Sequence, residues 1–415
     1  MNKKTRTPEI RIKEYQDDWE QYVLSEIATM HARIGWQNLR TSEFLDNGEY
    51  LLITGTDFVD GKINYATCHY VEKERYEQDK NIQLKNGSIL ITKDGTLGKV
   101  AYVQDLTMPA TLNAGVFNVE IKNENKVDEK YLFQYLKAPL LMSYVAQRAT
   151  GGTIKHLNQG ILVDFPIKMP IIDEQIEIGQ FLHNLDKYFL LHKKEYERLC
   201  CVRKSMVESM FPQDGKDVPA IRFKQFTDPW VYRSFSEIFI ERHVIDTISD
   251  EYPQLSFTIE EGVIRPEDRK TNKRDFLILD IENKKYLQTE LNDIIYNPAN
   301  VIYGAIHRNR LGKGCVSPIY KIFYTSQDPT FMECIVRHPR FINTISRSME
   351  GTVKKLRTLK PEAFLKMNAY IAPTVEEQKM IGNFFLELDK LIAVEETEME
   401  KIDHIRKTCV EKMLI

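Results

Sequence analysis

Two long stretches of the chain carry apolar residues at alternating spacings of four and three, the pattern of a coiled-coil helix. They cover residues 173–210 and residues 376–415. The two align at a constant displacement of 203 residues, with D-E-Q-I-E-I-G matching E-E-Q-K-M-I-G and R-K-S-M-V-E matching R-K-T-C-V-E. The chain is therefore a duplication, and each half ends in a long helix of the same design.

We expect the two helices to pair as an antiparallel coiled coil, each on the order of 50 Å long at about 1.5 Å per residue. The residues expected to pair are Ile178, Leu182, Leu185 and Phe189 on the first helix and Ile381, Phe385, Leu388 and Ile392 on the second. His192 and Glu395 interrupt the two apolar rows at equivalent positions. Since the middles of antiparallel helices meet, we predict that these two residues hydrogen-bond and fix the register. Two ordinary core helices are the alternative.

The segments between the helices contain short apolar runs broken by Gly, Asn and Asp, which predict strands joined by tight turns. Strands are expected at residues 50–53, 88–91, 100–103, 277–279, 293–296 and 301–303. Helical spacing follows at residues 130–149 and 331–349. The prediction is a mixed α/β fold with four divisions. These are residues 1–157 (first globule), 158–218 (first helix region), 219–360 (second globule) and 361–415 (second helix region).

A repeated segment leads into each globule. It reads P-E-I-R-I-K from Pro8 and P-A-I-R-F-K from Pro219, and each copy has a tryptophan eleven residues after its proline. The alternating apolar residues at 10 and 12, and at 221 and 223, predict a short strand in each copy. Trp19 and Trp230 are expected to anchor these segments in the core.

The charge distribution limits the possible classes of function. Residues 8–157 carry a net charge of −4 and residues 219–360 carry +4, so neither globule has a strong basic footprint for nucleic acid. Six cysteines without paired or metal-ligand spacing favour free thiols in a reduced, cytoplasmic setting. No apolar run is long enough to span a membrane, and the basic N-terminus lacks the apolar stretch of a secretory signal.

Motifs for covalent chemistry are weak. Asn297-Pro298-Ala299 lacks the second proline and the aromatic residue of an amino-methyltransferase motif. The loop 95–99 is too short for a phosphate-binding P-loop and is followed by valine in place of Ser or Thr. No metal-ligand spacing is found. We therefore expect neither a catalytic centre nor a metal site in this chain.

Basic residues on glycine-bearing loops are the better candidates for binding, because Lys and Arg contact phosphates and Arg can pair with a guanine edge. Two such loops occupy corresponding places in the two halves, and two Gly-Thr turns follow them. The candidate DNA-binding residues are Lys93, Thr96, Lys99, Thr153 and Lys155 in the first half, and His307, Arg308, Arg310, Lys313, Lys354, Lys355 and Arg357 in the second.

Taken together, these motifs resemble one family, the DNA-specificity subunits of type I restriction-modification systems. The resemblance rests on the duplicated leading segment with its Trp, the G-T-x-x-x-L turns and the P-I-I-D-E-Q-I-E-I-G and P-T-V-E-E-Q-K-M-I-G helix starts. It also includes R-K-S-M-V-E-S-M-F-P at the first helix end, and Y-N-P-A and G-C-V-S-P-I-Y in the second half. It covers nearly the whole chain.

The resemblance implies two target-recognition domains in a pseudo-two-fold arrangement, each reading half of a bipartite DNA sequence and separated by the helices. It implies two modification (methyltransferase) subunits and restriction subunits as partners. S-adenosylmethionine, ATP and Mg are then cofactors of those partners, with none in this chain. One alternative is a subunit of a combined restriction–methylation enzyme. Another is a coiled-coil scaffold that carries two modules binding something other than DNA.

Overall fold

The computed structural model describes residues 8–12, 14–148, 156–213, 215–269, 284–349 and 358–414, and of Trp36 the backbone alone. The chain divides into two compact units. The first comprises Met1–Lys193 and Thr397–Ile415, and the second comprises Lys194–Glu396. Each unit therefore contains one globule and part of both long helices. Helices and strands mix in both units, which confirms the predicted fold class.

The first unit is built on a four-stranded antiparallel sheet in the order β2-β10-β7-β8 and a three-stranded sheet in the order β6-β3-β9. The strands of these sheets are β2 (Ala28–His31), β3 (Tyr50–Ile53), β6 (His69–Val71), β7 (Ile89–Thr92), β8 (Val100–Tyr102), β9 (Ala110–Leu112) and β10 (Val116–Ile121). The predicted strands at 50–53, 88–91 and 100–103 are thus confirmed. Smaller elements are α1 (Leu24–Ile27), β4 (Phe58–Val59), β5 (Lys62–Ile63), α2 (Lys73–Glu77) and α5 (Gln159–Leu162).

The second unit repeats this plan with different strands. Its four-stranded sheet has the order β13-β21-β18-β19 and its three-stranded sheet the order β14-β17-β20. The strands are β13 (Phe239–Glu241), β14 (Ile245–Asp246), β15 (Ser256–Thr258), β16 (Gly262–Ile264), β17 (Tyr286–Thr289), β18 (Ile294–Tyr296), β19 (Ile306–Arg308), β20 (Gly314–Val316) and β21 (Lys321–Thr325). The strand predicted at 293–296 is confirmed. The one predicted at 277–279 lies outside the described residues.

The strand expected at 301–303 is wrong, because this segment is the 3-10 helix η8 (Val301–Tyr303). Asn297 starts a turn here, with its Oδ1 accepting from the backbone N–H groups of Ala299 (3.0 Å) and Asn300 (3.2 Å). Gly304, at φ +89°, then reverses the chain. The apolar run Val301–Tyr303 therefore forms part of a turn, because it lies between the Asn297 side-chain hydrogen bonds and Gly304.

Each single helix expected at residues 130–149 and 331–349 is in fact two. The structure has α3 (Glu129–Lys137), α4 (Pro139–Arg148), α7 (Pro329–Val336) and α8 (Pro339–Ser348). Proline disfavours the helical conformation in the residue before it. Ala138 (ψ 154°) and His338 (ψ 133°) are accordingly extended, so both helices break at the same place.

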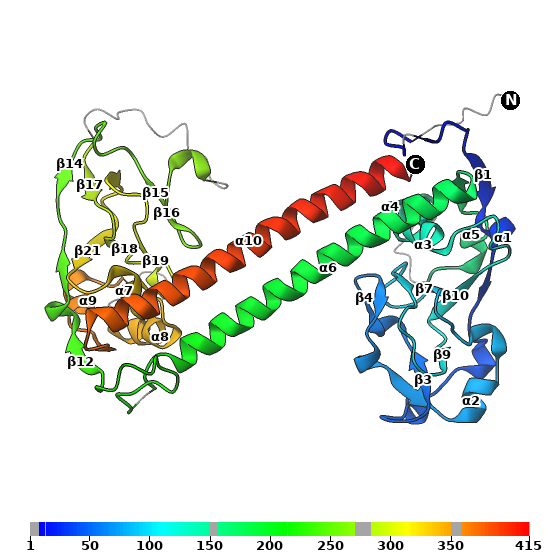
Figure 1. The fold of residues 1–415 in the computed structure, drawn as a ribbon, viewed down its shortest axis with the longest axis horizontal. Helices are drawn as coiled ribbons and strands as arrows, with labels where there is room; N and C mark the ends of the chain where they lie inside the picture. Colours follow the sequence, from blue (N-terminus) through cyan, green and yellow to red (C-terminus); the bar gives the residue numbers. More distant parts are fainter. Residues whose placement is uncertain are drawn as a thin grey trace. The chain divides into compact units, whose positions relative to one another are not determined.

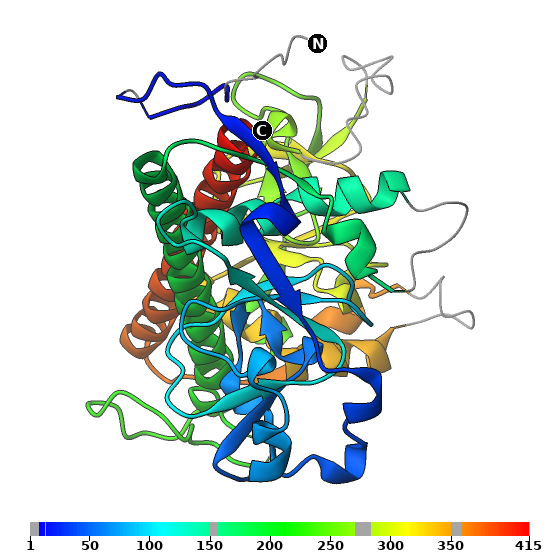
Figure 2. The same cartoon turned by 90° about the vertical axis from the view of Figure 1, so that its right-hand side faces the viewer.

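The two long helices are confirmed as α6 (Ile172–Ser209) and α10 (Val375–Met413). In the first unit, the start of α6 and the end of α10 run side by side (Figures 1 and 2). Val410, Met413 and Leu414 pack into the same core cluster as Ile178 and Leu182. In the second unit, Met206 and Val207 from late α6 join Ile381 and Phe385 from early α10 in one cluster. Both units therefore give the helices an antiparallel course.

The leading segments are not strands, which corrects the expectation for the described residues 8–12 and 219–223. The strands begin after the tryptophans. β1 (Glu20–Val23) pairs with β11 (Pro166–Met169), and β12 (Val231–Ser234) pairs with β22 (Asn368–Ile371); α9 (Pro361–Leu365) precedes β22. The tryptophans do anchor the core, with 4% and 3% of Trp19 and Trp230 exposed.

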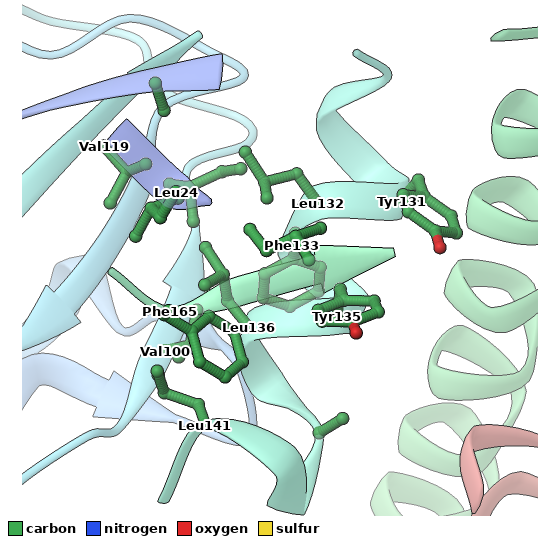
Figure 3. Packing of buried hydrophobic residues seen from close by; sticks show 14 of the residues in the cluster. Leu24, Val100, Val119, Tyr131, Leu132, Phe133, Tyr135, Leu136, Leu141 and Phe165 are labelled. Carbon is green, nitrogen blue, oxygen red and sulfur yellow. The ribbon is translucent and has the colours of Figure 1, made fainter. Parts of the chain in front are cut away.

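The main core of the first unit lies between the four-stranded sheet, α3 and the start of α6. Trp19 meets Tyr131 of α3 edge-on, with ring centroids 6.2 Å apart. Figure 3 shows Leu132 and Leu136 of α3 beside Leu24 and Phe165 in this cluster. The helix α3 therefore joins the sheet to the long helix.

Candidate nucleic-acid interface

The leading segment of each repeat ties both long helices together within its unit. In the first unit, Arg11 forms a two-pronged ion pair with Glu174 at the start of α6, through Nε–Oε1 and Nη2–Oε2 contacts of 2.8 Å each. The neighbouring Ile10 N–H donates to the Lys412 carbonyl at the end of α10 (3.1 Å). The hydrogen bond to Glu174 raises the pKa of Arg11.

The second unit makes the same contacts with the roles of the helices exchanged. Arg222 pairs with Glu377 at the start of α10 at 2.7 and 2.9 Å, and this hydrogen bonding raises the pKa of Arg222. The Ile221 N–H donates to the Ser209 carbonyl at the end of α6 (2.9 Å). Trp230 Nε1 also donates to Glu377, at 3.2 Å.

We call each set of contacts a clamp, consisting of the Ile-Arg dipeptide, the helix-start glutamate and the helix-end carbonyl. The clamps explain why the leading segment is not a strand. In each copy the isoleucine N–H donates to a carbonyl at a helix end and not to a neighbouring strand. Sequence reasoning missed both arginines. A signal was present, because Arg11 and Arg222 occupy equivalent positions, as do Glu174 and Glu377.

The repeated E-Q-x-x-x-G motif fixes each globule to its helix start. Gln175 accepts from the Asp128 N–H (3.1 Å) and donates to the Lys126 carbonyl (3.0 Å), which holds the turn before α3. Gln378 likewise accepts from the Asp328 N–H before α7 (2.9 Å). A Cβ on Gly179 would lie 2.6 Å from the Tyr131 nitrogen, so only glycine allows this approach.

The residues predicted to pair the helices are distributed as follows. Ile178, Leu182, Ile381, Phe385 and Leu388 are buried, and Leu185, Phe189, His192, Ile392 and Glu395 are half-buried. Two equivalent ion pairs join the helices, one in each unit. They are Asp186–Arg406 at 3.1 Å and Arg203–Asp389 at 2.5 Å.

The pairing of His192 with Glu395 stays a prediction, because the two residues belong to different units. Within the first unit, His192 interacts electrostatically with Glu398. The pKa of Glu398 is lowered first by a hydrogen bond from Lys401 and also by the charge of His192.

In the first globule, the loop after β7 carries Lys93, Thr96 and Lys99. Thr96 and Lys99 are exposed, while the Lys93 ammonium lies 5.4 Å from the Phe117 ring centre. The segment after the Gly-Thr turn lies against this loop, since the Leu157 N–H donates to the Lys93 carbonyl (2.8 Å). The described residue Leu157, which follows the selected Thr153 and Lys155 in the sequence, thus contacts the loop of Lys93.

In the second globule, the loop after β19 carries Arg310 and Lys313 on the surface. Lys313 pairs with Glu251, and its ammonium lies 5.3 Å from the Tyr252 ring centre. His307 has an interior position in place of the exposed one expected. Its side chain is 3% exposed, and Nε2 donates to the Ile259 carbonyl at 2.7 Å. Burial lowers the pKa of His307 to about 4.

Arg308 is also turned inward, to the carboxylate of Glu333 on α7. Its Nε lies 3.3 Å from Glu333 Oε2, and Arg310 Nη2 lies 2.9 Å from the same oxygen. Arg337 approaches the other oxygen at 3.8 Å. Burial acts to raise the pKa of Glu333, but the arginines hold that pKa below its usual range.

The remaining candidates lie outside the described residues. These are Thr153, Lys155, Lys354, Lys355 and Arg357 of the two Gly-Thr turns. In the part of the chain that is described, no group of three or more His, Cys, Asp or Glu side chains could hold a metal ion. Nor is any described helix both long and apolar enough to cross a membrane. The six cysteines are free thiols.

Comparison with known proteins identifies relatives of this fold. Residues 16–200 match the family described as the type I restriction modification DNA specificity domain. The MjaVIII type I restriction enzyme specificity subunit of Methanocaldococcus jannaschii is 22% identical, over 91% of this chain and 92% of its own. A putative MjaX specificity subunit of the same organism is 23% identical, over 97% and 94%.

The fold is shared with a solved structure. The type I restriction-modification S subunit from M. genitalium superimposes with a TM-score of 0.66 over 99% of each chain, at 15% sequence identity. Matches along the whole sequence thus agree with a match in fold. Residues 16–200 match the type I specificity domain, and over nearly its whole length the chain is similar in sequence to specificity subunits of type I restriction-modification systems and shares the fold of one of them.

Proposed function

We propose that this chain is a specificity subunit that reads a bipartite, asymmetric DNA target, one half with each globule, while the paired helices set the distance between the halves. The observation that carries the proposal is the repeated clamp. Arg11–Glu174 and Arg222–Glu377 attach each globule to the helices in the same way, while the exposed loops differ. A common attachment with different surfaces suits two readers of two different sequences.

The side chains on the loop after β7 and on the loop after β19 differ, which supports recognition of a different DNA sequence by each globule. The first loop bears Lys93, Thr96 and Lys99 around two glycines at φ +72° and +71°. The second offers Arg310, whose forked guanidinium can pair with both acceptors of a guanine. Lysine acts as a point charge, so we expect the first loop to contribute more to phosphate contacts and the second more to base contacts.

Helix length supports the role in spacing. The 38 residues of α6 span about 57 Å at 1.5 Å per residue. One turn of B-DNA is about 34 Å long. Helices of this length extend over about 1.7 turns of B-DNA, which is enough to separate half-sites by the one to one-and-a-half turns expected.

We propose two modification (methyltransferase) subunits as partners docked on the helix regions, with restriction subunits joining them. S-adenosylmethionine, ATP and Mg then act in those partners, and this chain supplies recognition without chemistry. The small net charge of the globules supports the need for partners. Phosphate attraction dominates affinity for DNA, and neither globule supplies much of it alone.

The test is sequencing of N6-methyladenine in cells that express this chain with its modification subunits. We expect methylation within one bipartite motif. Exchanging residues 28–155 for those of another specificity subunit should change one half of the motif and leave the other. A complex that methylates without a bipartite motif would exclude the proposal.

The second candidate is a coiled-coil scaffold that carries two modules for ligands other than DNA. The weak basicity of residues 8–157 favours it. Duplex binding measured against salt separates the two. A reader held by phosphate contacts loses affinity steeply as salt rises, whereas a scaffold of this kind binds no duplex with or without modification subunits.

A further inference from the structure

One buried carboxylate in the second unit serves three arginines of unequal exposure. The side chain of Glu333 is 5% exposed and that of Arg308 is 11% exposed. Arg337 is 36% exposed and Arg310, on the loop after β19, is 45% exposed. Glu333 therefore connects an arginine on the surface with one in the interior.

The loop that carries Arg310 is held by hydrogen bonds from the buried side chain of Asn309. Asn309 is fully buried, and its Oδ1 accepts from the Leu311 (3.0 Å) and Gly312 (3.2 Å) N–H groups. Its Nδ2 donates to the Gly312 carbonyl at 2.7 Å. The backbone around Arg310 is thus fixed by Asn309, and its side chain is directed by Glu333.

The Glu333 carboxylate keeps positively charged partners when Arg310 leaves it. A buried charge that loses its last partner is strongly destabilising. Glu333 keeps Arg308, which is itself held by Asn292 Oδ1 at 2.7 Å, and also accepts from the Arg308 N–H at 3.2 Å. Arg337 also remains near Glu333, as the second positive charge beside Arg308. The ion pair with Arg310 is therefore the one that can be exchanged for another acceptor.

We propose that Glu333 is a positioning residue for DNA recognition, holding the Arg310 guanidinium ready at the loop surface and releasing it to a base edge or phosphate of the second half-site. This inference rests on the proposed function and adds to it a residue pair, Glu333 and Arg310, that contributes to sequence specificity. The corresponding position on α3 is Phe133, so the device belongs to the second globule alone.

The experiment uses the full chain with its modification subunits and a duplex containing the methylated motif. Discrimination is measured for each half-site, as the ratio of affinities for the motif and for single-base substitutions. The variants are E333Q, R310A, the double variant, and E251Q as matched control. Glu251 pairs with Lys313 of the same loop but is 66% exposed.

We expect E333Q to lower discrimination at the second half-site about tenfold, the order of one lost base contact, with the first half-site unchanged. Binding to unrelated duplex should strengthen, because a negative charge beside the loop is lost. In the R310A background E333Q should change discrimination little, and E251Q alone should leave it unchanged.

Wild-type discrimination in E333Q would overturn the inference while leaving the proposed function intact. So would an equal loss at both half-sites, or a loss of the same size with Arg310 absent, since each indicates general structural damage. A wild-type complex without half-site discrimination would instead refute the proposed function. If E333Q fails to fold, E333D replaces it, because aspartate keeps the buried charge and withdraws it by one methylene from Arg310. The same loss at the second half-site is then expected, and unchanged discrimination overturns the inference.

Discussion

At the scale of single residues, the clamp arginines neutralise carboxylates that are shielded from water. Glu377 is completely buried, and Arg222 supplies the only positive charge that contacts it among the described residues. We expect R222M to lower the free energy of unfolding by about 3 to 5 kcal/mol, because it leaves a buried charge without a counter-charge. Urea unfolding of wild type and variant measures this.

R198Q is the matched control for that substitution. The pair of Arg198 with Glu195 is 62% and 40% exposed, so its removal should change stability by less than about 1 kcal/mol. The double variant R222M/E377Q should recover part of the loss, since no buried charge then remains. A loss in R222M no larger than in R198Q would contradict the role given to the clamp.

His307 makes stability depend on pH in a defined window. Burial lowers its pKa to about 4, against about 6.5 in an unfolded chain. Between these values the unfolded state binds more protons, so the contribution is complete above pH 6.5 and is lost as pH falls toward 4. The loss is on the order of 3 kcal/mol. H307Q should lose less stability than wild type over this range in urea unfolding, and parallel curves would contradict the prediction.

At the scale of elements, glycine decides how closely each globule approaches its long helix. A Cβ on Gly179 would meet the Tyr131 nitrogen at 2.6 Å and Asp128 Oδ1 at 2.7 Å. The nearest atoms to a Cβ on the equivalent Gly382 lie at 3.0 Å. G179A should therefore cost about 1 to 3 kcal/mol by overpacking, and G382A should cost less. Thermal unfolding of both variants tests this order, and the reverse order would contradict it.

The sequence predicts these elements unevenly, for physical reasons. Heptad spacing is a local property, so α6 and α10 are predicted within about two residues of their observed ends. The leading segments also show alternating apolar residues. Their partners, however, are the carbonyls of Ser209 and Lys412, and no local pattern indicates these distant helix ends.

The candidate site follows the same rule. Sequence analysis placed Arg308 and Arg310 in one basic loop, but Arg308 is the last residue of β19 and Arg310 alone of the two lies in the loop after it. It could not separate the inward arginine from the outward one, because that depends on Glu333 from a helix more than twenty residues later. His307 was misplaced for the same reason, since its acceptor is the distant Ile259 carbonyl.

At the scale of the whole molecule, the proposed function makes the helix pair a spacer whose length sets the gap in the DNA target. Seven residues inserted at the middle of both α6 and α10 keep the heptad phase, so the helices can still pair. The insertion adds about 10 Å, or up to about three base pairs at 3.4 Å each. We expect the methylated motif to keep both half sequences and to gain base pairs in its gap.

Insertion into α6 alone is the control, because the Arg203–Asp389 and Asp186–Arg406 pairs then cannot both form in register. That variant should lose stability and methylation together. The double insertion should retain methylation, since both clamps and both ion pairs are preserved. If the double insertion methylates the original motif with its original gap, the helices do not set the spacing. If it changes a half sequence, recognition is not confined to the globules.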